Sequence, residues 1–120
     1  IIIKLFHLVY EYDLDKDNLY KIRQEIVYNE EEFKALLNDK KFKKNYGELQ
    51  GEKNKVLPKE FKEAAEDIPL LYNKQFYYSA DLLPETILRD DLDEILIDYY
   101  LASKPVKDFF LRAVREIEQD

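Results

Sequence analysis

The sequence contains no cysteine, methionine or tryptophan, and it has only two glycines and one histidine. Without cysteine there is no disulfide, no zinc–thiolate site and no thiol nucleophile. The single histidine, His7, excludes any site that needs two histidines from this chain. No apolar run resembles a signal peptide or a membrane span. These absences predict a cytoplasmic protein with no membrane association and give no sign of a particular cofactor.

What is present is enough for one folded core. The 120 residues are 46% hydrophobic and 14% aromatic, with no internal repeat, low-complexity run or linker. We therefore expect a single domain over residues 1–120. Because the chain begins at Ile1 and has no methionine, we also expect it to be an incomplete part of a longer domain.

Charge is distributed unevenly along the chain. The net charge is −7, but the segment from Lys40 to Lys62 has eight lysines against three glutamates. That segment is therefore +5 and the rest is −12. Such an asymmetry can mark an anion-binding face, although a solvated surface is the simpler interpretation.

Two segments have the composition of strands. Residues 1–12 are rich in β-branched and aromatic residues, and so are residues 75–81. We expect these two segments to pair, with a short third strand at Lys55–Leu57. The helix expected with most support is Asp15–Tyr28, whose apolar residues recur at helical spacing.

Further helices follow from apolar spacing and from capping residues. Asn29 and Glu32 resemble a capping box that begins a helix ending near Asn38. Pro105 suits the first turn of a last helix. The full set of further helices expected is 29–38, 40–46 ending at Gly47, 62–67, 85–88, 90–103 and 105–117.

Together these elements predict an α+β fold. We expect a small antiparallel or mixed sheet packed against several helices, with a helix-rich C-terminal half.

Four blocks of sequence in a fixed order then suggest a family. They are Leu19–Ile26 with Asn29 and Glu32-Phe33; Gly47-Glu48-Leu49-Gln50-Gly51-Glu52-Lys53-Asn54-Lys55; Leu70-Leu71 to Lys74-Gln75-Phe76; and Pro105 with Asp108-Phe109-Phe110-Leu111. From about Asp17 to Glu116 the chain resembles the C-terminal part of the bacterial and fungal family called domain of unknown function 2461.

The resemblance has departures as well as matches. Family members commonly have a glycine near Glu60 and an Asp-His-Pro near Asp67-Ile68-Pro69, and this chain has neither that glycine nor that histidine. They also carry an upstream arginine- and aspartate-rich block, which is absent here. The resemblance therefore implies that part of a functional site lies upstream of these residues.

The candidate binding residues are Gly51, Lys53, Lys55 and Lys74. A glycine lets backbone N–H groups approach an anion closely, and lysines supply the charge, as in phosphate-binding loops. The segment lacks the Gly-Lys-Ser/Thr ending of a P-loop. A structural loop with solvated lysines is the alternative interpretation.

Two other constellations favour ordinary structural roles. Aromatic residues interleave with lysines, as in single-stranded nucleic-acid binders, but the acidic pI and the lack of an RNA-binding signature argue against nucleic acid. The residues concerned are Phe42, Tyr46, Phe61, Phe76, Tyr77 and Tyr78. A cluster of acids at 90–94 could hold magnesium, but acids also favour a helix N-terminus. We predict that this cluster caps a helix.

Two functional hypotheses remain. The first is a non-catalytic binding or interaction domain whose segment Lys40–Lys62 faces an anionic small molecule or protein partner. The second is a hydrolytic or phosphate-directed enzyme whose catalytic groups lie upstream, with Lys53, Lys55 and Lys74 as electrostatic support. No catalytic or metal-binding residue is assigned within the chain.

Overall fold

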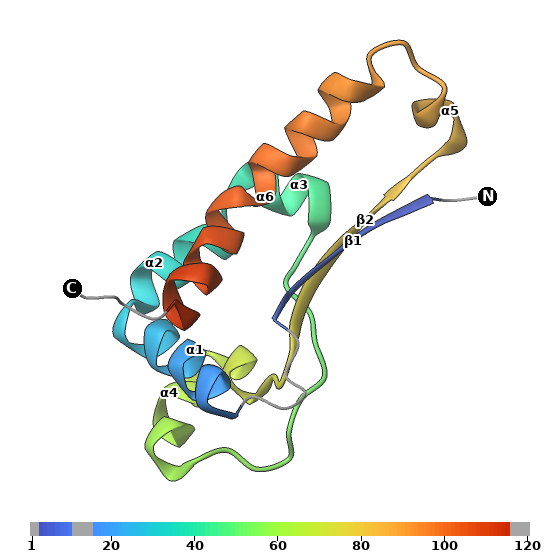
Figure 1. The fold of residues 1–120 in the computed structure, drawn as a ribbon. Coiled ribbons are helices and arrows are strands. Elements are labelled where there is room, and N and C mark those ends of the chain that lie inside the picture. The colour runs from blue at the N-terminus through green and yellow to red at the C-terminus, as the bar shows by residue number, and fades with distance from the viewer. Residues whose placement is uncertain (1–2, 11–15, 116–120) are drawn as a thin grey trace.

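The computed structural model describes residues 3–10 and 16–115, and of residues 3–10 it describes the backbone alone. This part contains six α-helices, two short 3-10 helices and two strands (Figure 1). Their bounds are β1 Ile3–Tyr10, α1 Lys16–Tyr28, α2 Glu30–Leu37, α3 Lys40–Tyr46, η1 Lys59–Phe61, α4 Lys62–Asp67, η2 Pro69–Tyr72, β2 Phe76–Leu82, α5 Pro84–Ile87 and α6 Leu92–Val114.

The predicted α+β class is wrong, because the described chain is mostly helical. Its β structure is one antiparallel ribbon in which Ile3 lies opposite Leu82 and His7 opposite Tyr78. The pairing expected between the two strand-like segments is confirmed. The ribbon has only two strands, and the buried face of β2 packs against α3 and α6. Helix is also spread over both halves of the chain, and is not concentrated in the C-terminal half.

The third strand expected at Lys55–Leu57 does not form. Val56 is 75% exposed, and Pro58, which has no N–H, follows directly after this stretch. The loop instead makes two isolated antiparallel bridges. Gln50 pairs with Tyr77 of β2, and Lys53 pairs with Asn73, which lies just before β2. The extended part of the loop therefore lies earlier in the chain than predicted.

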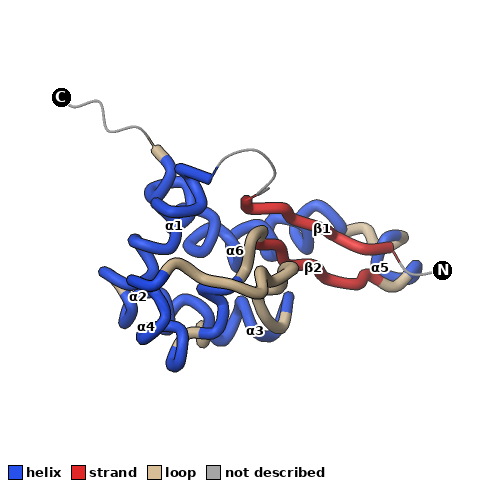
Figure 2. The backbone as a smooth tube through the Cα atoms, turned by 90° about the horizontal axis from the view of Figure 1, so that it is seen from below, coloured by secondary structure: helices blue, strands red, loops and turns tan. Residues whose placement is uncertain are grey.

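The long helix α6 organises the molecule. In Figure 1 it runs diagonally across the fold, with the β1–β2 ribbon on one side, α1 below its C-terminal end, and α2 and α3 overlapping it in this view. Seen from below, the 47–58 loop crosses beneath the helices as the long tan segment (Figure 2). The loop therefore joins α3 to η1 at the opposite end of the fold.

We predicted two helices here, separated near Ser103, and the structure has one helix of 23 residues with Pro105 inside it. The helix continues because its buried stripe stays in phase through the proline. Ala102, Val106, Phe109 and Ala113 are all buried at spacings of four, three and four residues. Residues 116 and 117 of the prediction lie outside the described residues.

The capping box predicted at Asn29 is also wrong. Asn29 makes no side-chain capping bond to α2, and its Nδ2 donates instead to Glu25 Oε2 at 3.0 Å. Glu32 is drawn away by Arg112, whose Nη2 lies 2.8 Å from Glu32 Oε1. This ion pair, which joins α2 to α6, lowers the pKa of the Glu32 carboxyl. A carboxylate four residues earlier and an arginine of α6 thus replaced the partners of the predicted cap.

Candidate functional site

The predicted site lies where the 48–53 loop pairs with the segment leading into β2. Gln50 N donates to Tyr77 O at 2.8 Å, Tyr77 N donates back to Gln50 O at 2.9 Å, and Lys74 N donates to Glu52 O at 2.8 Å. These backbone bonds hold the loop in an extended form along the outer edge of β2. The loop therefore has a fixed position from which to present side chains.

Gly51 permits this close pairing. A Cβ atom on Gly51 would lie 2.0 Å from Gln75 O and 2.6 Å from Asn73 Nδ2. Neither neighbour can withdraw easily, since one is backbone and the other belongs to a buried side chain. The glycine is thus explained by packing against the protein's own backbone.

A hydrogen-bonded node anchors the loop to the helices. Asn73 is fully buried, and its Oδ1 accepts from Lys53 Nζ at 2.7 Å while its Nδ2 donates to Gln75 O at 3.2 Å. Arg23 of α1, also buried, donates from Nη2 to Asn73 O at 3.3 Å and from Nε to Leu71 O at 2.8 Å. A buried guanidinium needs such partners to offset its desolvation. These hydrogen bonds fix α1, η2 and the 47–58 loop relative to one another.

Lys53 is the charged member of this node. Besides Asn73, its ammonium lies 3.4 Å from Pro69 O, and partial desolvation lowers its pKa from the usual 10.5. Two neutral oxygens therefore hold a cation for which no carboxylate partner is found among the described contacts. Lys53 as a whole is exposed, so its ammonium is only partly shielded from water and is open to an anionic group in solution.

A shallow pocket of about 430 Å³ opens beside this ammonium. Its walls come from the loop, η2 and the beginning of β2. The lining residues are Glu48, Leu49, Gln50, Gly51, Lys53, Pro69, Leu70, Asn73 and Tyr77. The pocket therefore offers one cation, one carboxylate, two amides and a phenol beside three apolar side chains.

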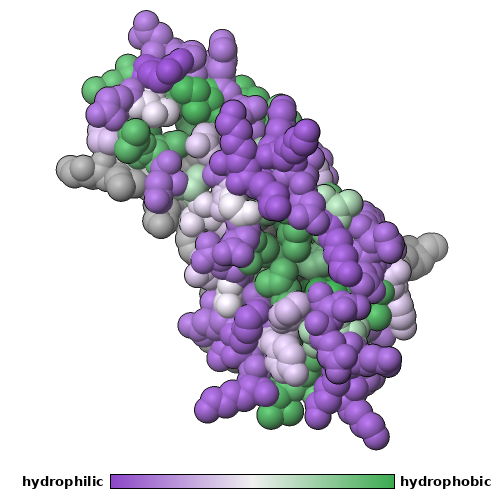
Figure 3. Space-filling model, turned by 180° about the vertical axis from the view of Figure 1, so that it is seen from behind, coloured by the Kyte–Doolittle hydropathy of each residue, from purple (hydrophilic) through white to green (hydrophobic). Residues whose placement is uncertain are grey.

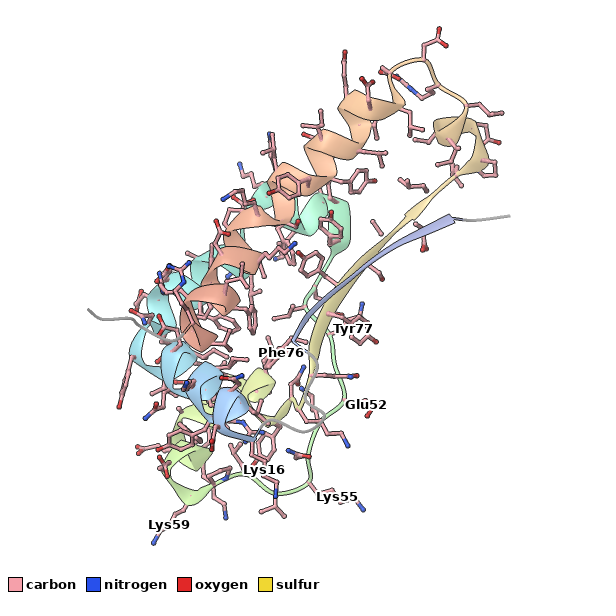
Figure 4. The ribbon with its side chains drawn as sticks, viewed as in Figure 1. Lys16, Glu52, Lys55, Lys59, Phe76 and Tyr77 are labelled. Atoms are coloured by element: carbon pink, nitrogen blue, oxygen red, sulfur yellow. The ribbon has the colours of Figure 1, made fainter. Side chains whose placement is uncertain are left out.

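The four candidate residues do not gather in one place. Gly51 and Lys53 line the pocket, whereas Lys55 and Lys74 do not. Lys74 Nζ lies 3.7 Å from Glu52 Oε1, and Lys55 points away from the chain at the outer edge of the loop (Figure 4). The structure thus brings together only the first pair.

The lysine-rich segment as a whole is spread along the molecule. Its first four lysines lie on α3, where Lys41 Nζ faces Asp98 Oδ1 of α6 at 3.8 Å. Lys55 and Lys59 lie at the far end of the loop (Figure 4). The net charge of +5 is therefore divided between two regions.

Most of the aromatic residues that interleave with lysines in the sequence belong to the core. Phe42, Tyr46, Phe61, Phe76 and Tyr78 are all at most 6% exposed. None of these five can stack on a nucleotide base without unfolding. The structural interpretation is confirmed for these five, whereas Tyr77, the sixth aromatic residue of the pattern, is half-buried and lines the pocket.

The acids at 90–94 lie at the beginning of α6. Arg89 holds the Asp91 carboxylate through two bonds of 2.8 and 2.9 Å, which lowers its pKa, and Asp93 Oδ1 accepts from Glu94 N at 2.9 Å. Asp91 is the N-cap residue but makes no side-chain capping bond. Within the described ranges, no three potential metal-ligating side chains come together.

Arg23 and Asn73 were not predicted from the sequence. A signal for both existed, since they lie in the blocks 19–26 and 70–76 that suggested the family. No local sequence pattern shows that the guanidinium of Arg23 donates to the backbone oxygen of Asn73, 50 residues later. Arg23 and Asn73 lie close to Gly51 and Lys53, so three of the four family blocks come together in the fold.

Comparison with known families supports that resemblance. A family model described as conserved hypothetical protein (DUF2461) matches residues 9–109. The chain belongs to this family. No curated protein and no solved structure gives a match. None of the helices in the described ranges is long and apolar enough to cross a bilayer.

Proposed function

We propose that this DUF2461 chain is a non-catalytic binding domain of the cytoplasm, and that its pocket beside Lys53 takes a small molecule bearing a phosphate or carboxylate group. The observation that carries the proposal is the position of the Lys53 ammonium. It lies at the wall of a pocket of about 430 Å³, held by Asn73 Oδ1 and by Pro69 O.

The node supports binding because the cation is already placed. A lysine free in solvent must lose side-chain entropy when it contacts a ligand, whereas Lys53 is held before the ligand arrives. Its lowered pKa reflects partial desolvation, which also strengthens attraction to an anion. Pre-organisation and desolvation thus act in the same direction.

The other polar groups narrow the ligand class. Glu48 also lines the pocket and would repel a second anionic group placed near it. Gln50 and Tyr77 can donate or accept hydrogen bonds. The ligand that fits best has one anionic group at Lys53 and neutral hydrogen-bonding groups, such as hydroxyls, elsewhere.

Binding can be tested by calorimetry with inorganic phosphate and with monophosphate and monocarboxylate compounds that carry hydroxyl groups. The informative variant is Lys53→Gln, because an amide can still donate to Asn73 and keep the node intact. Lys55→Gln is the matched control, since Lys55 is also exposed but lies outside the pocket.

We expect Lys53→Gln to weaken binding by about tenfold or more, and Lys55→Gln to change it by less than about twofold. A thermal-shift series would show the same order, because a ligand that binds only the folded state raises apparent stability. Equal affinities of the two variants, or no binding by the wild-type chain across the set, would refute the proposal.

A further inference from the structure

The first half of α6 carries an apolar stripe that no part of the described chain covers. Leu96, Ile97, Tyr100 and Leu101 are 38%, 56%, 48% and 54% exposed. They form two pairs four residues apart and so lie together on one side of the helix. Hydrophobic residues are also visible at the α5–α6 end in the space-filling view (Figure 3). Contiguous apolar surface of this kind commonly marks an interface.

Charged residues at both ends of the stripe indicate what covers it. Asp93 lies on the same side one turn before the stripe, and Lys104 lies on it one turn after. Positions 93, 97, 100 and 104 are separated by four, three and four residues, which is the spacing of a helix-pairing seam. The seam is therefore acidic at its N-terminal end and basic at its C-terminal end.

We propose that this face binds a second copy of the same chain, with the two α6 helices packed antiparallel about a two-fold axis that passes between positions 98 and 99. This axis places Asp93 against Lys104 of the other copy. It also places Leu96 against Leu101 and Ile97 against Tyr100. The same surface patch thus serves both copies, as a two-fold interface requires.

The charges select the antiparallel arrangement over the parallel one. Parallel helices in register would put Asp93 against Asp93 and Lys104 against Lys104, and like charges in contact are unfavourable. Lys104 already lies 2.7 Å from Asp108 of its own helix, so the Asp93 carboxylate of the other copy would complete a network.

The size of the patch predicts a dimer that dissociates on dilution. Four side chains per copy, each already partly covered, bury less area than a permanent interface does. Sedimentation velocity over about a hundredfold range of concentration would detect the equilibrium.

Charge reversal provides a specific test. Asp93→Lys places two lysines opposite each other, and Lys104→Asp places two aspartates opposite each other, so each variant alone should self-associate about tenfold more weakly or worse. In an equimolar mixture of the two variants, one copy carries lysine at both positions and the other carries aspartate at both. Each pair across the interface is then again of opposite charge. We therefore expect the mixture to recover association close to that of the wild type.

The control is Glu31→Lys, which makes the same charge change at an exposed position in the first turn of α2. It should associate as the wild type does. Recovery in the mixture also excludes misfolding as the cause of weak association in either variant. A wild-type chain that stays monomeric, variants that associate normally, or a mixture that stays dissociated would each overturn the proposal.

Discussion

At the scale of single residues, the structure gives the two glycines different roles. Gly47 ends α3 with φ of +83°, a left-handed conformation, and has open space around its Cα. Gly51 is enclosed by Gln75 and Asn73. Gly47 is therefore required for its backbone conformation alone, whereas Gly51 is required both for its φ of +157° and for the lack of a side chain.

This difference predicts unequal costs for alanine. Gly51→Ala should lower the free energy of unfolding by about 3 kcal/mol, because a Cβ cannot lie 2.0 Å from Gln75 O and the loop must separate from β2. Gly47→Ala should cost about 1 kcal/mol, from its left-handed backbone alone. Urea denaturation measures both values. A Gly51→Ala variant no less stable than Gly47→Ala would contradict the packing role.

At the scale of elements, α6 shows how burial overrides a helix breaker. Pro105 has no N–H to donate to Leu101 O, a loss that disfavours proline inside helices. Buried residues on both sides, Ala102 and Val106, keep the helix continuous. The ring itself is exposed and lines a groove of about 190 Å³ between α2 and α6.

Pro105→Ala should therefore stabilise the protein by about 2 kcal/mol, because it restores the hydrogen bond and removes the ring's clash with the preceding turn. Thermal unfolding at low protein concentration measures the gain. Lys107→Ala, also exposed on α6, should change stability by less than about 0.5 kcal/mol. If Pro105→Ala gave no gain, packing of the ring in the groove would have to offset the missing bond.

At the scale of the whole molecule, the fold is elongated. Its extents are 50 × 37 × 28 Å and its radius of gyration is 15.9 Å, against about 14 Å for a compact chain of this length. Two aromatic clusters fill its length. One joins Phe33, Phe76, Phe109 and Phe110, and the other joins Phe42, Tyr46, Tyr78 and Tyr99.

The second cluster makes stability sensitive to alkaline pH. Burial raises the pKa of Tyr46 to about 12, and it also raises the pKa of Tyr78. Tyrosines of the unfolded chain ionise near 10, so unfolding releases protons above that pH. The stabilising contribution is complete below about pH 10 and is lost as the pH rises toward about 12. For Tyr46 the loss should reach about 2–3 kcal/mol.

Denaturant titrations between about pH 9 and 12 check this expectation. The Tyr46→Phe variant loses the bond from the phenol to Tyr99 O, so it should be less stable at neutral pH but should lose less stability over the alkaline range. Tyr78 should account for part of the remaining loss. If both proteins lost stability equally over this range, Tyr46 would not be the group that titrates.

Local patterns were sufficient where one segment determines its own structure. The apolar stripe predicted α1, the strand-like segments predicted β1 and β2, and Gly47 predicted the end of α3. The family was also readable, because its blocks occur in order along the chain. Local patterns failed where a residue distant in the sequence determines the contact. Glu32, for example, binds Arg112 of α6 and does not form the predicted capping box.

The sequence by itself determined the family, the positions of most helices, the pairing of the two strands and the lysine-bearing loop. Only the tertiary structure decided the mostly helical class, the continuity of α6 and the node where Arg23 and Asn73 hold Lys53. The physical reason is that propensity and spacing act within a few turns of chain. Burial, close approach and hydrogen bonding join residues 20 to 50 positions apart.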